Sequence, residues 1–107
     1  MSVLAEAQDK VAKAFAGMMG RDFDRFSVGE WDEMVTGAPA LVNATAVFDC
    51  EVKQVIDQFS HSIFIGQVLA ARHMKNQDTL LYGARRFRSL RKTFSEQVGS
   101  SDESLHF

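Results

Sequence analysis

Hydrophobic positions near the start of the chain recur at helical spacing. Between Val3 and Met19 the apolar residues lie three or four positions apart, and the charged residues fall mostly on the other side. Ser2 can cap the start of such a helix, and Gly17 or Gly20 can end it, because glycine readily adopts the left-handed conformation found after a helix. The pattern therefore predicts an amphipathic helix over this stretch.

The segment from Arg21 to Pro39 has no regular period. Large aromatic residues alternate there with charged residues, glycines and the chain's single proline. This composition indicates a long connection, with one short helical turn at Gly29–Met34. A connection of this length is usually functional, disordered or packed on the surface. The aromatic residues that favour a packed surface loop are Phe23, Phe26 and Trp31.

From Ala44 the period changes to two, as in a strand with one face toward solvent. Asp57–Ser60 supplies a turn, and Ser62–Ala71 predicts a second strand that is apolar on both faces and should therefore be central. Polar residues at 75–78 predict another turn, and residues 79–82 a short third strand. The order of helix, loop and antiparallel meander indicates an α+β or barrel fold and not a βαβ fold.

Composition and charge exclude several classes of protein. A chain of 107 residues that is 46% hydrophobic and 24% charged is typical of one soluble globular domain. It has neither the roughly 18 consecutive apolar residues of a membrane-spanning helix nor a secretory signal, so we expect a cytoplasmic protein. A net charge of −2 argues against a general nucleic-acid binder. The single cysteine, Cys50, excludes an intrachain disulfide and a CxxC motif.

Common catalytic signatures are absent from the sequence. The three histidines (His61, His73 and His106) lack metal-ligand spacing, so no metal site is expected. There is no GxSxG elbow and no glycine-rich phosphate loop. A cluster of basic residues at 85–92 is typical of a solvated helix end. His61 begins the second strand directly after a turn, where periodicity alone favours a rim histidine bonded to a turn carbonyl.

Several short segments together change this interpretation of His61. Residues 60–68, SHSIFIGQV, resemble the T/D-H-x-I-F-I-G-x-V segment of the flavin reductase-like family, the FMN-binding split barrels. Other segments resemble family motifs in the same order. The first group is VL, Gln8 and FAG (within residues 3–17), and the second is DRF and Trp31 (24–31). Then come PAL, Ala46 and FDC (39–50), followed by LLY, RF and Leu90 (80–90). Each motif alone is weak, but their order and spacing are together specific.

The resemblance implies a mainly β fold with some α structure (α+β), namely a Greek-key split β-barrel that binds FMN. Because Met1 to Leu4 align with the inside of a family strand, it also implies a barrel incomplete at its N-terminus. Residues 1–94 would be the C-terminal portion of the domain, and residues 95–107, rich in serine and acids, a disordered tail. Such barrels are typically homodimers, and an unpaired strand edge strengthens that expectation.

The activity implied by the resemblance is an NAD(P)H-dependent flavin reductase. Hydride passes from NADH or NADPH to FMN or FAD, and the reduced flavin serves a partner monooxygenase; the cofactor carries the chemistry, so no protein nucleophile is needed. His61 would be the catalytic residue at the edge of the nicotinamide and flavin. Arg86 and Phe87 would approach the dinucleotide, and Arg25 and Phe26 would contribute to the flavin pocket or the dimer seam.

Two other functions remain open from the sequence. The absent phosphate-holding strands favour a non-catalytic, truncated split-barrel fragment that acts only in dimerisation or flavin binding. A flavin- or haem-binding split barrel with another redox role is the third possibility. The histidine and the Arg-Phe-x-x-Leu ending at 86–90 favour the reductase.

Overall fold

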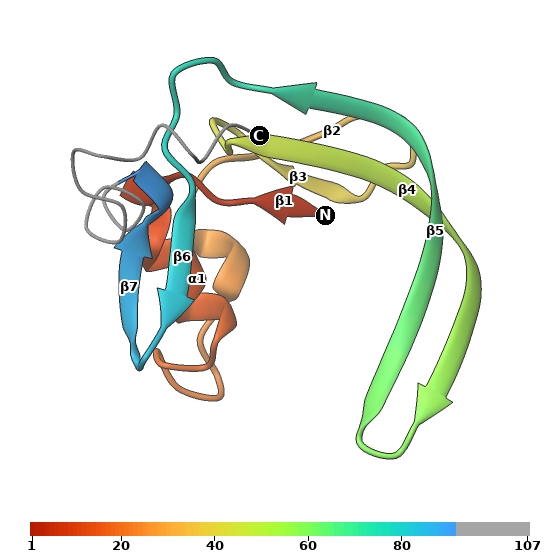
Figure 1. Ribbon diagram of the computed structural model, residues 1–107, viewed down its shortest axis with the longest axis horizontal. Helices are drawn as coiled ribbons and strands as arrows, with labels where there is room; N and C mark the ends of the chain where they lie inside the picture. Colours follow the sequence, from red (N-terminus) through yellow and green to blue (C-terminus); the bar gives the residue numbers. More distant parts are fainter. Residues whose placement is uncertain (92–107) are drawn as a thin grey trace, which may run out of the picture.

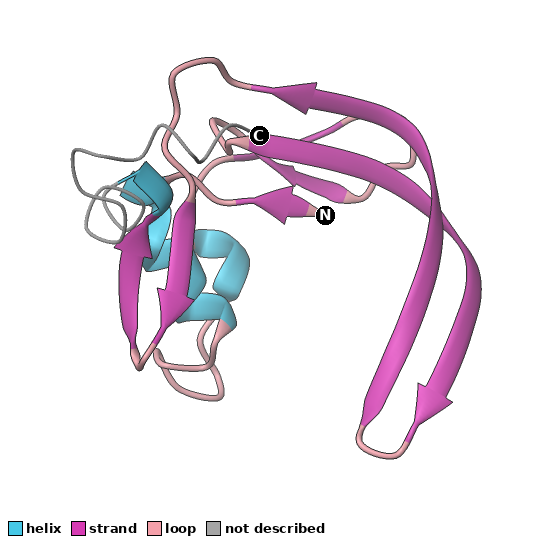
Figure 2. Cartoon of the chain, in the orientation of Figure 1, coloured by secondary structure: helices cyan, strands magenta, loops and turns pink. Residues whose placement is uncertain are grey.

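The computed structural model describes residues 1–91 of the chain, and its elements are mostly strands with one α-helix (Figures 1 and 2). This confirms the predicted α+β class with a predominance of β structure. The expected tail at 95–107 lies outside the described residues. The elements are β1 (Ser2–Val3), the 3-10 helix η1 (Glu6–Gln8), α1 (Asp9–Phe15), the 3-10 helix η2 (Arg25–Ser27), β2 (Trp31–Glu33), β3 (Pro39–Leu41), β4 (Ala46–Gln58), β5 (His61–His73), β6 (Leu80–Gly83) and β7 (Arg86–Ser89).

The N-terminal helix is shorter than the sequence predicted. Ser2 and Val3 are extended because they pair antiparallel with the start of β4. The Ser2 hydroxyl accepts a hydrogen bond from the Leu41 amide at 3.2 Å and does not cap a helix. The predicted end is confirmed, since Gly17 follows the C-cap of α1 with φ +81°. Pairing with a distant strand thus outweighs the local helical period at the first residues.

Strands β4 and β5 form one long antiparallel hairpin, here called the arm (residues 46–73), joined by the two-residue turn Phe59-Ser60. Two register shifts, after Asp49 and after Val52, mark irregularities of the bulge type that bend a strand. The arm accordingly curls outward from the rest of the chain (Figure 1). The order of the sheet is β1-β4-β5, so among residues 1–91 strand β5 is an edge strand. The prediction that it is central is wrong for residues 1–91, because β5 pairs there with β4 alone, and its apolar faces are exposed.

The remaining strands form two short antiparallel pairs, β2 with β3 and β6 with β7. The helical turn expected at Gly29–Met34 is wrong, because this segment contains β2 and the 3-10 turn lies earlier, at η2. The third predicted strand exists as β6, but it pairs with β7 and does not extend a meander from β5. Residues 86–89, interpreted as part of a basic helix end, form β7 because the chain reverses directly before them.

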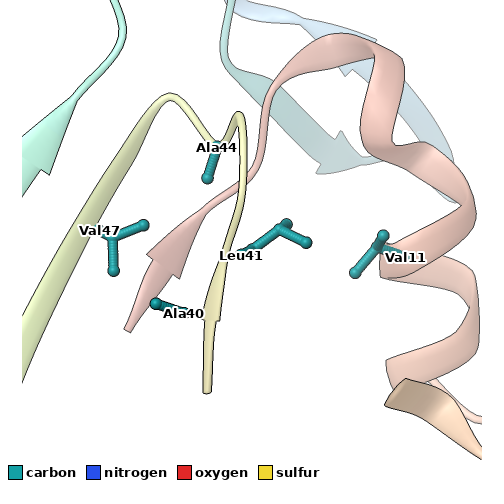
Figure 3. Packing of buried hydrophobic residues seen from close by; sticks show 5 residues of the cluster. All are labelled: Val11, Ala40, Leu41, Ala44 and Val47. Atoms are coloured by element: carbon teal, nitrogen blue, oxygen red, sulfur yellow. The ribbon is translucent and has the colours of Figure 1, made fainter. Parts of the chain in front are cut away.

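The buried core is small and lies between α1, β3 and the base of the arm (Figure 3). Leu41 is fully buried at its centre. Leu4, Val28, Trp31 and Met34 pack against this cluster and cover it from the loop side. The core therefore fixes α1 and the base of the arm to each other, while the distal arm has no part in it. Its buried members are Val11, Ala40, Leu41, Ala44 and Val47.

The turn between β6 and β7 yields a first stability prediction. Ala84 and Arg85 have φ of +52° and +63°, and a two-residue hairpin turn with two left-handed residues favours Asn-Gly. The double substitution Ala84→Asn with Arg85→Gly should therefore stabilise the fold by about 1 kcal/mol, or roughly 4–8 °C in melting temperature. Thermal unfolding followed by circular dichroism measures this.

A matched control is Asn76→Gly, at another left-handed position (φ +62°) that already carries a favourable residue. Its melting temperature should change little. A melting temperature of the double variant at or below that of the unaltered chain would contradict the strain assigned to this turn.

Candidate functional site

Three aromatic side chains from different elements meet beside α1. The ring centroid of Phe26 lies 5.2 Å from that of Phe15 and 5.1 Å from that of Trp31, and Phe15 and Trp31 are 5.6 Å apart. The indole nitrogen of Trp31 donates a hydrogen bond to the Val28 carbonyl at 2.9 Å, which fixes the ring. These contacts confirm that Phe26 and Trp31 pack the long connection against α1, whereas Phe23, the third aromatic residue expected to do so, is not part of this group.

The three rings line a hollow of about 440 Å³, here called the aromatic hollow. Its volume is in the range of small-molecule sites, and its lining is mainly apolar, as such sites usually are. Phe26 is 50% exposed and therefore presents a ring face to whatever enters. The other residues that line it are Met1, Ser2, Leu4, Val11, Ala12 and Pro39.

A second, smaller hollow of about 260 Å³ lies between α1 and the β6–β7 hairpin. Phe87 lines it, with its ring 4.9 Å from that of Tyr82 and with the Lys13 ammonium 5.8 Å from its own centroid. Leu4 and Ala12 line both hollows, so the two are neighbours. The fold thus brings Phe26 and Phe87, predicted from separate motifs, to adjacent apolar hollows.

Both predicted arginines are exposed, Arg25 on η2 and Arg86 at the start of β7. Each is followed in the sequence by the aromatic residue of one hollow, but neither arginine is among the residues that line the two hollows. On β7 the fold also buries the Nε atom of Arg88, which has no hydrogen-bond partner within the described part of the chain. The sequence had not singled out Arg88.

His61 lies elsewhere, at the tip of the arm. Its ring is exposed, and its Nδ1 atom lies 2.9 Å from the Ser60 hydroxyl, which orients the imidazole and leaves Nε2 available. Figure 1 shows the arm tip and the β6–β7 hairpin on opposite sides of the molecule. One chain alone therefore does not bring His61 to Arg86 and Phe87, and the role assigned to His61 stays a prediction.

Asp49 is a buried polar residue that the sequence pattern placed on the solvent side of its strand. It is 5% exposed, and its carboxylate accepts hydrogen bonds from the Val35 amide (2.7 Å), the Thr36 amide (2.8 Å) and the Thr36 hydroxyl (2.5 Å). These bonds, with that of the Thr36 hydroxyl foremost, lower the pKa of Asp49. Asp49 thereby anchors the β2–β3 connection to the arm. The only local sign of this burial in the sequence was that the acidic residue lies between Phe48 and Cys50.

A second polar anchor connects β2 to the end of β5. The Arg72 guanidinium donates two hydrogen bonds to the Asp32 carboxylate, at 2.9 and 2.8 Å, and a third to the Leu41 carbonyl at 3.2 Å. The side-chain hydrogen bond between Arg72 and Asp32 lowers the pKa of Asp32 and raises that of Arg72. Together with Asp49, this pair holds β2, whose Trp31 lines the aromatic hollow, against the base of the arm.

Two other findings bear on the kind of site. Within residues 1–91 no group of three histidine, cysteine or acidic side chains is placed to hold a metal ion. The described helices are all too short or too polar to cross a membrane.

Comparison with known proteins identifies the family. Residues 1–91 match the flavin reductase like domain. "FMN reductase (NADH) RutF" of Acinetobacter baylyi is 38% identical over 87 residues, which cover 81% of this chain and 46% of that protein. The chain spans about half the length of the curated relatives it matches.

Solved structures of flavin reductases resemble the fold. BorF, the flavin reductase component of a bacterial two-component tryptophan halogenase, is 35% identical with a TM-score of 0.72, over 83% of this chain and 57% of that chain. The NADH:FAD oxidoreductase SgcE6 of Streptomyces globisporus C-1027, in complex with NAD and FAD fragments, is 29% identical with a TM-score of 0.70, over 81% and 52% of the two chains. With the matching domain over residues 1–91 and the order of motifs, these likenesses show that the chain belongs to the flavin reductase like domain family.

Proposed function

We propose that the protein is an NAD(P)H-dependent flavin reductase that transfers hydride from a nicotinamide to FMN or FAD. The observation that carries the proposal is an apolar, aromatic-lined hollow in a chain of this family. NADH and FMN are the preferred pair, since the relatives' descriptions name them. Reduced flavin would pass to a partner monooxygenase, by analogy with the styrene monooxygenase flavin reductase of Pseudomonas putida S12, or to another oxidative partner, by analogy with the halogenase that BorF serves.

The residues around the aromatic hollow fit a planar flavin ring. Phe15, Phe26 and Trp31 offer ring faces and edges, and the rest of the lining is mainly apolar. Arg25 lies beside Phe26 and can donate to a phosphate or a ring carbonyl. When bound, flavin supplies the hydride-accepting atom. The chain's own contribution is to hold the two rings at reacting distance and to exclude water.

The predicted roles divide between the two hollows and the arm. Phe87 shields one side of the nicotinamide, and Arg86 donates to the phosphates of the dinucleotide. His61 donates from Nε2 to the carboxamide or to a ring carbonyl, with Ser60 holding its other ring nitrogen. Because His61 and Arg86 lie on opposite sides of a single chain, we place this site between the protomers of a homodimer. We also propose that the curled arm belongs to a Greek-key split barrel.

A binding and activity assay tests the proposal. Purified chain is titrated with FMN while flavin fluorescence is followed, and NADH oxidation is then measured at several FMN concentrations. The reductase is expected to bind FMN and to oxidise NADH in proportion to added flavin. FMN binding without NADH oxidation would favour the non-catalytic alternative. A chain that shows no FMN binding and no NADH oxidation would refute the reductase and would leave, of the alternative, only a role in dimerisation.

Arg86 offers a sharper test of the dinucleotide site. Arg86→Ala removes a charge-assisted donor and should raise the KM for NADH about tenfold, with a smaller effect on kcat. The matched control is Arg85→Ala, the neighbouring exposed arginine in the turn, which should change the KM less than twofold. If the two substitutions raise the KM for NADH equally, Arg86 contributes only general positive charge and makes no specific contact with the dinucleotide.

A further inference from the structure

Trp31, one wall of the aromatic hollow, lies on a strand that cannot hold its own position. Strand β2 has three residues, and within residues 1–91 it pairs with β3 alone. In the register of that pair Trp31 lies directly opposite Leu41. An isolated two-stranded pair is at best marginally stable. The position of the indole therefore depends on what binds β2 and β3 to the rest of the chain.

One rung of the β1-β4-β5 sheet binds β3 from both sides of Leu41. In this rung Val47 of β4 lies opposite Ser2 of β1 and opposite Arg72 of β5. Directly opposed residues share one face of a sheet, and both polar side chains of the rung reach Leu41. The Leu41 amide donates to the Ser2 hydroxyl at 3.2 Å, and the Leu41 carbonyl accepts from the Arg72 guanidinium at 3.2 Å. The residue opposite Trp31 is thus bound to the sheet through its N–H and through its C=O.

Arg72 also reaches β2 itself. Its guanidinium donates two hydrogen bonds to the carboxylate of Asp32, at 2.9 and 2.8 Å, and Asp32 follows Trp31 in the strand. Such a two-pronged contact fixes direction as well as distance, because the guanidinium is planar and its donors are rigid. A surface ion pair that contributed only charge would not need the third bond, to Leu41. One side chain therefore joins β2, β3 and β5 beside Trp31.

We infer that Arg72 is a positioning residue of the aromatic hollow, which fixes Trp31 through Asp32 and Leu41. The inference deepens the proposed function and rests on it for the identity of the ligand, a planar flavin ring. Arg72 is not among the residues that line the hollow, so it acts on the flavin through Trp31 and not by contact. A wall that is already in place when the ligand arrives lowers the cost of ordering the site on binding.

Spectra of Trp31 test the positioning without any ligand. It is the chain's single tryptophan, so the indole signals report this ring alone. Arg72→Gln should weaken the near-ultraviolet circular dichroism band of the indole, which reflects fixed packing, and leave the far-ultraviolet spectrum unchanged. Asp32→Asn should have the same effect, and Arg72→Lys, which keeps the charge but lacks the planar fork, an intermediate one. The matched control is Lys53→Gln, which breaks another exposed ion pair of the arm, with Glu51 at 3.1 Å, and should leave the band unchanged.

Binding and kinetics separate positioning from general stability. At a temperature where every variant is folded, Arg72→Gln should raise the Kd for FMN about fivefold, which corresponds to one well-formed ion pair. The KM for NADH should rise less than about twofold, because the dinucleotide site is not attached to β2. Arg72→Gln combined with Asp32→Asn should bind FMN no more weakly than Arg72→Gln alone, since both substitutions break the same contact. Lys53→Gln should bind FMN as tightly as the unaltered chain.

Two results would overturn the inference. One is an indole band and an FMN affinity that Arg72→Gln leaves unchanged. The other is an equal loss of FMN and NADH affinity, which would indicate a general loosening of the fold.

The same measurements distinguish this inference from the reductase proposal. If the unaltered chain does not bind FMN, but Arg72→Gln and Asp32→Asn weaken the indole band and Lys53→Gln does not, the positioning of Trp31 stands and the reductase fails. If Arg72→Gln uses FMN and NADH as the unaltered chain does, the reductase stands and the role of Arg72 falls.

Discussion

Replacement of His61 by alanine is expected to raise the NADH concentration needed for half-maximal velocity at least tenfold, while the affinity for FMN changes little. In the proposed site the imidazole donates to the nicotinamide carboxamide or to a ring carbonyl at its edge. Removal of a donor at a water-excluded site leaves its partner unsatisfied, which accounts for an effect of this size. Steady-state kinetics with NADH as the varied substrate, together with FMN titration, separates the two constants.

Two variants control this prediction. His61→Gln keeps a side-chain donor and should recover part of the lost NADH affinity. His73→Ala removes the exposed histidine at the opposite end of the same strand and should leave both constants unchanged. If His61→Ala weakens FMN and NADH binding equally, His61 supports the flavin or the arm turn and does not act on the nicotinamide.

The largest loss of stability is expected from Asp49→Ala. The substitution leaves the Val35 and Thr36 amides and the Thr36 hydroxyl without their acceptor in a part-buried position. Unsatisfied donors in such a place are among the few causes of severe destabilisation, so the melting temperature should fall by at least about 5 °C. Differential scanning calorimetry at pH 7 measures the effect. Thr36→Val, which removes only the hydroxyl, should show a smaller loss.

Asp49 should also make stability depend on pH. Its pKa in the folded chain is lowered from 3.8, so the carboxylate's contribution is fully present above that ordinary value. It is lost progressively as the pH falls through 3.8 toward the lower folded-state pKa. Asp49→Asn should therefore flatten the fall in melting temperature between about pH 5 and pH 2. A variant as acid-sensitive as the unaltered chain would assign the dependence to other groups, Asp32 first, because its pKa is lowered by Arg72.

The local sequence pattern predicted the structure correctly where the deciding interactions are between residues close together in the chain. The period of two from Ala44 predicted the first strand of the arm, because alternation follows from the pleat of a strand whatever lies beside it. The apolar run at Ser62–Ala71, directly after a turn, predicted the second. It also predicted a turn at Asp57–Ser60, and the observed turn lies within that range. The family motifs went further. They assigned Phe26 to the flavin pocket or the dimer seam and Phe87 to the dinucleotide; each lines an apolar hollow, and its role there stays a prediction.

Local pattern failed where a distant segment decided the outcome. Val3 begins the helical period and Ser2 was expected to cap it, yet both are extended in β1 because Val47 and Ala46 offer them a strand edge. Asp49 has the alternation of a solvent-facing position, but the loop at 35–36 covers it and donates to it. A window of neighbouring residues contains no information about either partner.

By itself, then, the sequence determined the class of fold, the family and the two strands of the hairpin at residues 46–73. Only the tertiary structure decided which apolar faces are covered and where the arm carries His61. The physical reason is that burial depends on which segments approach one another. Two apolar faces on β5 indicate that other segments should pack against the strand, but the local sequence does not identify those segments. In the part of the chain that the structure describes, β5 stays exposed on both faces, and His61 lies at the tip of the arm, away from the β6–β7 hairpin.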